Sequence, residues 1–422
     1  MEAMEDKVMK PGTVARLLAA SVAFALGCST APPEPDTAAI DAVLRSAVAR
    51  GDVAGVVAAA VSPSGLVYHK AFGKRGVARN RDMTFDSIFR IASMTKPVTS
   101  VAAMQLYERG AFDLDDAVGK YLPPLAEVQV LDGFDENGRP ILRPPATPLT
   151  VRHLLTHTSG LGYELWSGPL RDYMKAASVP SALSGGDEFL HVPLLFDPGQ
   201  RWEYGVNTDW LGKLVETLSG QSLDEYFRQH IFEPLGMSDT HFNLPAEKAD
   251  RLVTYHHRQA DGRLVEAALE PFVARSFFSG GGGLVSTAGD YLRFVEMLLN
   301  EGSLGTARIL APETVALMAQ NHIGELEAGA MKTVMPALTN DFDFFPAAAD
   351  RFGLGFLLNR DPVDGGRSQD SLAWAGLYNT YFWIDRERGV GGVLLVQVLP
   401  FFDAKAVGLL ESFERAVYSV VR

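Results

Sequence analysis

The strand-forming segments of this chain lie at its two ends, and this placement constrains the fold more than any other feature. Residues 56–62 and 66–72 are rich in apolar and β-branched residues and flank a Pro-Ser-Gly turn, which predicts a β-hairpin. Residues 380–385 and 390–399 predict a second hairpin. We expect both hairpins to form one antiparallel β-sheet built from both termini and flanked by helices, an α+β fold with an inserted, mainly helical region.

Helical periodicity surrounds these strands. Apolar residues at 40–48 recur at helical spacing between the capping residue Asp36 and the glycine stop Gly51. The same pattern predicts a closing helix over residues 406–420. With 422 residues and 47% apolar content, the chain can bury a large core.

The amino terminus has the features of an export signal. Lys7, Lys10 and Arg16 precede the apolar run 17–26, which is too short to span a bilayer. Cys28 is the only cysteine of the chain, so no intramolecular disulfide can form.

The residues Leu26-Gly27-Cys28 resemble a bacterial lipobox, although Ala25 stands where that pattern usually has leucine. The resemblance implies cleavage before Cys28 and membrane anchoring through a lipid on its sulfur. An ordinary cleaved signal and an unprocessed hydrophobic start remain alternatives, and translation starting at Met9 would remove the acidic residues that precede it. We expect an exported protein of the periplasm or bacterial envelope.

These observations divide the sequence into parts. They are a signal peptide with a lipobox at 1–28, a Pro-rich linker at 29–36 that suits a tether, and a folded domain at 37–422. Within the domain, residues 37–90 and 280–422 contain the sheet, and residues 91–279 are mainly helical.

The charge of the chain argues against a nucleic-acid partner. The chain has 38 Lys and Arg against 51 Asp and Glu, a net charge of -13, and no basic run that would neutralise phosphates. We therefore expect no nucleic-acid partner.

Ser93-Met94-Thr95-Lys96 places a hydroxyl and an amine one helical turn apart, directly before Pro97. Proline is tolerated in the first turn of a helix, so Pro97 predicts a helix that begins near Ser93. The helix start and partial burial both favour an uncharged Lys96. Ser93 and Lys96 are therefore a candidate nucleophile and base, although Ser-x-x-Lys also occurs by chance.

Tyr204 is the candidate for a further proton transfer. It follows a Pro-Gly turn within residues 197–212. A phenol held between the lysine and the nucleophile can carry a proton to the leaving group. The alternative is a packed aromatic residue whose hydroxyl is satisfied.

Four further motifs lie at separate places along the chain. They are Leu-Leu-Thr-His-Thr-Ser-Gly-Leu at 154–161, Pro-Leu-Gly-Met at 234–237, Gly-Gly-Gly-Gly-Leu-Val-Ser-Thr at 280–287 and Trp-Ala-Gly at 374–376. With the Ser-x-x-Lys and Tyr204 segments, they resemble the serine hydrolases grouped with class C β-lactamases and penicillin-binding proteins, most closely the family VIII carboxylesterases. The resemblance covers nearly everything after the linker and implies a serine β-lactamase-like fold.

The resemblance also implies roles for individual residues. Ser93 would be the nucleophile, Lys96 the base and Tyr204 the third member of a Ser-Lys-Tyr triad. The backbone NH groups of Ser93 and Leu377 would form the oxyanion hole. This chemistry requires no metal and no organic cofactor.

The third motif separates activities within the resemblance. Lactamases and transpeptidases carry Lys-Thr-Gly there, whereas this chain has Trp374 and Gly376, which we expect to bind substrate. A tryptophan wall favours uncharged esters over anionic β-lactams. Val206 stands where lactamases use an asparagine on the substrate amide, and Asn207, one residue later, is a further candidate substrate-binding residue.

Other candidates have plainer interpretations. His153 and His157 lie four apart on a helix expected after Thr150, but without a third ligand we take them as structural. Residues 280–283 are expected to let the backbone pass close beneath the site. Several aromatic residues could line an acyl pocket or pack in the core: Phe342, Phe344, Phe345, Phe401 and Phe402.

The sequence thus favours an exported serine carboxylesterase that hydrolyses uncharged, short-chain, small-molecule esters through a covalent acyl-enzyme. Two alternatives stay open. One is a β-lactamase or D-alanyl-D-alanine peptidase, and the other is a non-catalytic envelope binding protein. The oligomeric state and the natural ester are left open by the sequence.

Overall fold

The computed structural model describes residues 36–268, 273–346 and 349–421. The expected signal segment, Cys28 and all but the last residue of the linker lie outside the described residues. None of the helices in the described ranges is both long and apolar enough to cross a bilayer.

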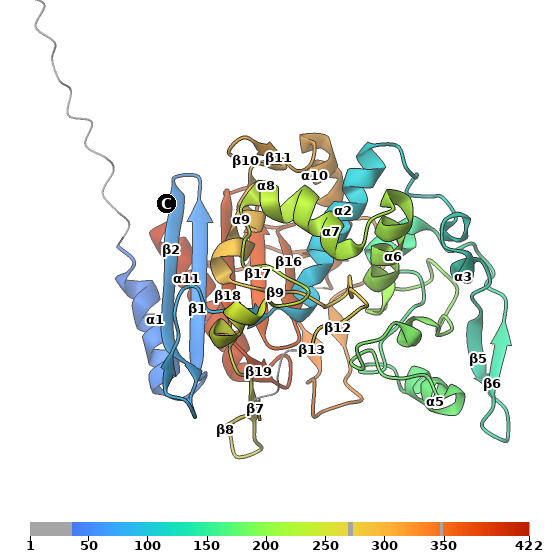
Figure 1. The fold of residues 1–422 in the computed structure, drawn as a ribbon, viewed down its shortest axis with the longest axis horizontal. Coiled ribbons are helices and arrows are strands. Elements are labelled where there is room, and N and C mark those ends of the chain that lie inside the picture. The colour runs from blue at the N-terminus through green and yellow to red at the C-terminus, as the bar shows by residue number, and fades with distance from the viewer. Residues whose placement is uncertain (1–35, 269–272, 347–348, 422) are drawn as a thin grey trace, which may run out of the picture. The chain divides into compact units, whose positions relative to one another are not determined.

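Both predicted hairpins are confirmed, and they lie side by side in one antiparallel sheet (Figure 1). β1 (Gly55–Ser62) pairs with β2 (Gly65–Gly76), and β17 (Thr380–Asp385) pairs with β18 (Val390–Leu395). Because β18 also pairs with β1, the two ends of the chain meet in the sheet. The order of the eight strands is β14-β15-β16-β17-β18-β1-β2-β3.

The sheet is wider than the two hairpins. β16 (Leu372–Gly376) pairs with β17, and β15 (Leu357–Leu358) and β14 (Arg351–Phe352) complete that edge. β3 (Arg81–Asp82) forms the other edge. Two-residue strands have no period that a sequence pattern could reveal, so β3, β14 and β15 were not predicted.

The second hairpin is shorter than predicted. β18 ends at Leu395, and β19 (Val398–Leu399) pairs in parallel with β7 (His256–Arg258). Gln397 explains the break, because its amide donates to the Arg90 carbonyl at 3.0 Å and accepts from the Arg90 NH at 3.2 Å. These polar contacts hold the chain beside residue 90 and away from β1.

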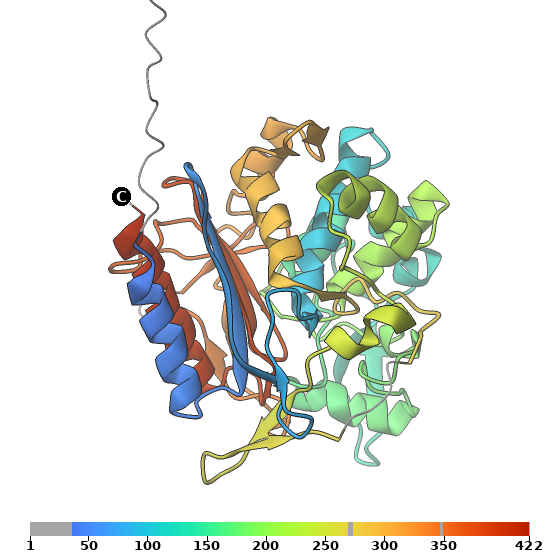
Figure 2. The ribbon, with the colours of Figure 1, turned by 60° about the vertical axis from the view of Figure 1, so that its left-hand side comes forward.

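Helices cover both faces of the sheet, and every residue of β1 is therefore buried (Figure 2). Side chains at even positions from 56 to 60 belong to the core beneath α1 (Ala38–Ala49) and α11 (Ala404–Val420), which confirm the two predicted terminal helices. Side chains at odd positions from 57 to 61 belong to the larger core, where α9 (Ala288–Leu299) packs on the sheet.

Residues 91–279 contain most of the remaining helices and also two unpredicted hairpins. The helices are α2 (Thr95–Glu108), α3 (Pro123–Ala126), α4 (Val151–Thr156), α5 (Gly168–Ala177), α6 (Asn207–Ser219), α7 (Leu223–Phe227) and α8 (Glu233–Leu235). The hairpins are β5 (Val130–Phe134) with β6 (Pro140–Arg143), and β7 with β8 (Leu264–Glu266). Further elements are α10 (Pro312–Met318) and the pairs β4 (Phe89–Arg90) with β9 (Val285–Ser286), β10 (Ser303–Leu304) with β11 (Ala307–Arg308), and β12 (Ala330–Met331) with β13 (Phe342–Asp343).

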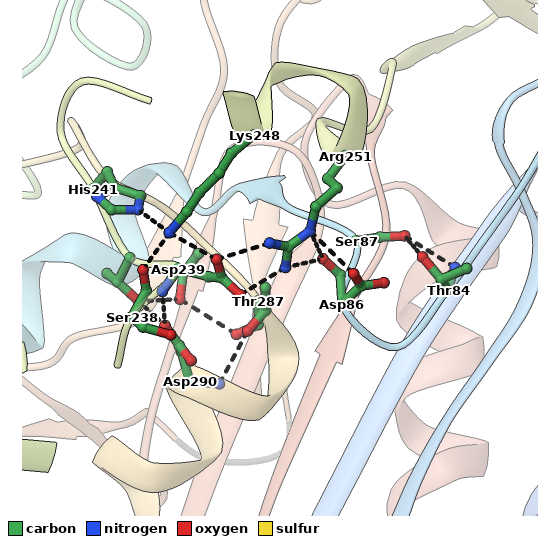
Figure 3. Close-up of polar contacts among 12 residues, drawn as sticks. Thr84, Asp86, Ser87, Ser238, Asp239, His241, Lys248, Arg251, Thr287 and Asp290 are labelled. Carbon is green, nitrogen blue, oxygen red and sulfur yellow. Dashed lines mark hydrogen bonds and ion pairs between the residues drawn. The ribbon is translucent and has the colours of Figure 1, made fainter. Parts of the chain in front are cut away.

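An ion-pair cluster anchors the segment that leads to Ser93 (Figure 3). The Arg251 guanidinium donates to the Asp239 carboxylate at 2.9 and 2.6 Å and to the Asp86 carbonyl at 2.9 and 2.6 Å. Lys248 Nζ lies 3.0 Å from Asp239 Oδ1. These bidentate contacts hold the chain just before β4, which pairs with β9 and then turns toward Ser93.

A second ion pair is buried between α11 and the loop before β16. Arg367 and Glu414 have side chains 5% and 6% exposed. The Glu414 carboxylate accepts from Arg367 Nε at 2.9 Å and from the Arg367 backbone NH at 3.0 Å. Removing one partner of such a pair leaves an uncompensated buried charge.

We expect Glu414→Gln to lower the free energy of unfolding by about 3 kcal/mol, because Arg367 then stays charged without its carboxylate. Denaturant unfolding measures this loss. The matched control is Glu411→Gln, which removes the exposed partner of Arg415, 3.3 Å away, and should change the free energy by less than about 0.5 kcal/mol. Equal effects of the two substitutions would contradict the prediction.

Candidate active site

The structure brings the predicted nucleophile and base together. Ser93 lies in a single 3₁₀ turn (Ala92–Met94) directly before α2, and Lys96 lies in the first turn of α2. Ser93 Oγ and Lys96 Nζ are 3.3 Å apart. Ala92 has a φ of +43°, a sparsely populated conformation for a non-glycine residue and a form of strain that clusters at functional sites.

Lys96 is buried, and only 2% of it is exposed. Its amine donates to the Gly281 carbonyl at 2.7 Å and to the Tyr163 hydroxyl at 3.2 Å. Burial lowers the pKa of Lys96 to about 7, against the opposing charge of Asp209. A neutral amine has two N–H donors and one lone pair, so donation to Gly281 and Tyr163 leaves the lone pair for the Ser93 hydroxyl.

Asp209 and Tyr163 complete this network, although no role was predicted for either residue from the sequence. The Tyr163 hydroxyl donates to Asp209 Oδ2 at 3.4 Å. Asp209 Oδ1 accepts from Ser279 Oγ at 2.6 Å and from the Gly281 NH at 3.0 Å. Burial raises the pKa of Asp209, and Lys96 is the strongest opposing influence. A polar chain therefore runs from Ser93 through Lys96 and Tyr163 to Asp209.

The sequence signal for Asp209 was present but weak. It stands five residues after Tyr204, within the motif segment 197–212 and near the start of α6. Tyr163 had no such signal, because it reaches Lys96 from a loop 67 residues away.

The glycine-rich segment passes beneath the site, as expected. A Cβ on Gly281 would lie 2.3 Å from Asp209 Oδ2, and one on Gly280 would lie 2.7 Å from the Thr208 carbonyl. Only glycine allows this approach, which puts the Gly281 carbonyl on Lys96 and its NH on Asp209.

Tyr204 lies beside the pair, 3% exposed. Lys96 Nζ is 4.6 Å from the centroid of its ring. Burial raises the pKa of Tyr204 above its usual value. Ser93 and Trp374 are near enough to oppose that shift, but the Tyr204 hydroxyl has no hydrogen-bond partner of acceptable geometry among the described residues. The phenol is therefore protonated and available to a substrate.

The third motif lies on β16, close to Ser93. A Cβ on Gly376 would lie 2.2 Å from the Ile91 carbonyl, so the close packing of β16 against the residues before Ser93 requires glycine. Trp374, Gly376 and Leu377 line the same cavity as Ser93. The oxyanion hole of the Ser93 and Leu377 backbone NH groups stays a prediction.

The cavity beside Ser93 has about 840 Å³ of space, including space open to solvent, and eight of the residues that line it are aromatic. The aromatic residues that line it, besides Tyr163 and Tyr204, are Trp166, Phe189, Phe342, Phe344, Trp374 and Phe401. Of the five phenylalanines singled out in the sequence, Phe345 and Phe402 instead line a second cavity, which shares Phe344 and Trp374 with the first.

Asn207, one of the residues expected to bind substrate, lies outside the cavity beside Ser93. Asn207 is fully buried and does not line the cavity. Its amide nitrogen contacts His157 Nδ1 at 2.9 Å and the Leu161 carbonyl at 3.2 Å, and its oxygen accepts from Ser159. All its polar groups are thus used within the protein. The expectation that Asn207 binds substrate is therefore wrong, and its role is to hold α6.

The two histidines lie in structural surroundings, in agreement with their interpretation from the sequence. His153 Nδ1 accepts from the Thr150 NH at 3.2 Å as part of the capping box of α4. His157 is buried, and its ring centroid is 5.1 Å from that of Tyr204. His157 thus packs behind the phenol.

Comparisons with known proteins point to one family. The family model described as Beta-lactamase matches residues 40–411. Monacolin J acid methylbutanoyltransferase of Aspergillus terreus is 36% identical over 397 residues, which cover 90% of this chain and 95% of that protein. Lovastatin esterase of Penicillium rubens is 31% identical over 396 residues, which cover 90% of this chain and 98% of the esterase.

Solved structures agree with this result. Unliganded simvastatin synthase (LovD) from Aspergillus terreus matches with a TM-score of 0.80 and 33% identity, covering 91% of this chain and 98% of that chain. EstCE1, a hydrolase with promiscuous acyltransferase activity, has the same fold with a TM-score of 0.73, 24% identity and coverage of 90% and 98%. Family match, identity and fold together show that this chain belongs to the Beta-lactamase family, as a β-lactamase-like serine hydrolase or acyltransferase.

Proposed function

We propose that this chain cleaves carboxylic esters through an acyl-enzyme on Ser93. The observation that carries the proposal is the buried Lys96 amine, which has a pKa of about 7 and lies 3.3 Å from Ser93 Oγ. Such an amine is neutral in a large fraction of molecules at neutral pH and can accept the serine proton.

The proposed reaction has two stages. Ser93 Oγ attacks the ester carbonyl carbon while Lys96 takes the hydroxyl proton, and the negative charge on the carbonyl oxygen is met by the expected oxyanion hole. Tyr204, kept protonated by its raised pKa, gives a proton to the departing alcohol, and Lys96 restores the phenol. Water then attacks the acyl-enzyme by the reverse route and releases the acid.

The residues that line the cavity favour substrates whose acyl and alcohol groups are apolar. The aromatic walls of the cavity suit apolar groups, and Trp374 offers no cation at the position where β-lactamases hold the substrate carboxylate. We therefore favour esters without an anionic group beside the reacting carbonyl, short-chain esters among them, over β-lactams.

Acyl transfer to an alcohol is the second candidate, and the comparisons favour it. Monacolin J acid methylbutanoyltransferase is among the relatives, alongside lovastatin esterase. Hydrolysis and transfer share the acyl-enzyme and differ only in whether water or an alcohol attacks it. An aromatic cavity that admits a bulky alcohol and limits water would favour transfer.

Export and a lipid on Cys28 remain proposals. The matched family region begins at residue 40, so the comparisons do not bear on them.

Residues 37–422 should hydrolyse short p-nitrophenyl esters and leave a chromogenic cephalosporin largely intact. Ser93→Ala should abolish ester turnover and labelling by a phosphonate that reacts with serine hydrolases. Nitrophenolate release and mass spectrometry provide the measurements. Cephalosporin turnover alone would favour the lactamase alternative, and no turnover of either would favour a binding protein. An added small alcohol that is converted to its ester identifies acyl transfer.

The acid limb of kcat/KM should have an apparent pKa near 7, because Lys96 must lose its proton to act as the base. Activity should therefore rise as the pH passes through 7 from below. Lys96→Arg should lower kcat by about 100-fold or more, because arginine keeps its proton. Near-normal turnover by Lys96→Arg across the pH range would remove lysine as the base.

Asp209→Asn should move the acid limb to lower pH. The negative charge of Asp209 raises the Lys96 pKa, so its removal lowers that pKa further. Asparagine keeps an oxygen for Ser279 and Gly281. The matched control is Asp290→Asn, another buried carboxylate, which accepts from the Asp239 NH at 2.7 Å away from the site. An unmoved limb in Asp209→Asn, or an equal shift in the control, would contradict this electrostatic role.

A further inference from the structure

Arg275 is the only basic residue among the described residues that line the cavity beside Ser93. It is exposed, whereas Tyr163, Tyr204 and Asp209 are buried at the inner end of the cavity. Within the described ranges, its guanidinium makes no hydrogen bond and no ion pair. The cavity thus has an inner reactive end, aromatic walls and one unpaired cation on its solvent-exposed side.

The backbone of Arg275 is held in place. Its NH donates to Asn243 Oδ1 at 2.9 Å, and its carbonyl accepts from Asn243 Nδ2 at 3.0 Å. The side chain lies over Gly185, where an added Cβ would be 3.4 Å from Arg275 Nε. Gly185 has a φ of +95°, so a glycine is favoured there and the space beneath the guanidinium stays open.

Among the described residues, the acidic side chains of the segments around the cavity do not pair with Arg275. Asp187 pairs with Lys213 at 3.2 Å, and Glu164 accepts from Ser181 Oγ at 2.6 Å. Glu188 folds back over Gly186, where an added Cβ would be 2.1 Å from its carboxylate, and it forms no ion pair with Arg275. An arginine that has no acidic partner among the described residues and lies beside a substrate cavity is available to a ligand.

We propose that Arg275 forms an anion subsite, and that the preferred substrate is an ester with an apolar body and a carboxylate distant from the reacting carbonyl. This inference rests on the proposed esterase function. A guanidinium binds a carboxylate through two parallel N–H donors, which fix orientation as well as charge. The aromatic walls would hold the body of the ester while Arg275 holds its carboxylate, so that the ester carbonyl reaches Ser93.

Matched esters test the subsite. On the acyl side, p-nitrophenyl hydrogen adipate is compared with the p-nitrophenyl ester of adipic acid monoamide. On the alcohol side, 4-acetoxybenzoate is compared with 4-acetoxybenzamide. Each pair differs in charge and hardly in shape, so the ratio of the two KM values isolates the carboxylate even in a protein with a net charge of -13.

In at least one pair, Arg275→Gln should raise KM for the anionic ester about five-fold or more, with kcat nearly unchanged. KM for the neutral ester should stay within about two-fold, and Arg275→Lys should recover part of the loss. The charge control is Arg263→Gln, which removes an exposed arginine elsewhere and should leave the ratio unchanged. An unchanged ratio in both pairs for Arg275→Gln would overturn the subsite while leaving ester hydrolysis standing.

Failure of the esterase proposal has a different signature, because neither neutral ester would then be turned over. In that case calorimetric binding of 4-acetamidobenzoate and 4-acetamidobenzamide to the unmodified protein and to Arg275→Gln decides the subsite. Weaker binding of the carboxylate alone in Arg275→Gln would support it, and equal loss or no loss for both ligands would overturn it.

Discussion

The burial of one amine is the constraint on which the site depends. Lys96 has a pKa near 7 because it lies in a poorly solvated interior. An amine in that position still needs partners for its N–H groups, and the Gly281 carbonyl and the Tyr163 hydroxyl supply them. Its lone pair is thereby left for Ser93. Burial and hydrogen bonding together leave this lysine able to act as the proposed base at neutral pH.

The scaffold keeps this arrangement rigid from several sides. The ion pairs of Arg251 hold the segment before β4, and β16 packs on Ile91 through Gly376, so the 3₁₀ turn that carries Ser93 is held from two directions. The sheet itself is stabilised on both faces, since the side chains of β1 alternate between two cores. A small displacement of Ser93 would therefore require repacking of the sheet or the helices.

The local parts of the site could be predicted, because residues three apart in a helix meet whatever the remainder of the chain does. Ser93 and Lys96 are such a pair, and Pro97 indicated where their helix begins. For Asn207, proximity in the sequence did not predict which way the side chain points. Its position near Tyr204 suggested a substrate contact, but α6 turns its amide toward His157. Sequence neighbours share a segment and do not necessarily share a face.

The sequence by itself determined the two hairpins, the terminal helices and the Ser-x-x-Lys helix start, because each depends on short-range geometry and local patterning. Only the tertiary structure decided that Tyr163 and Asp209 complete the network around Lys96, which aromatic residues line the cavity, and that the Arg275 guanidinium lies beside it with no partner among the described residues. These contacts join segments distant in the sequence. These contacts depend on how the helices, loops and sheet pack, and the periodicity of a sequence does not encode that packing.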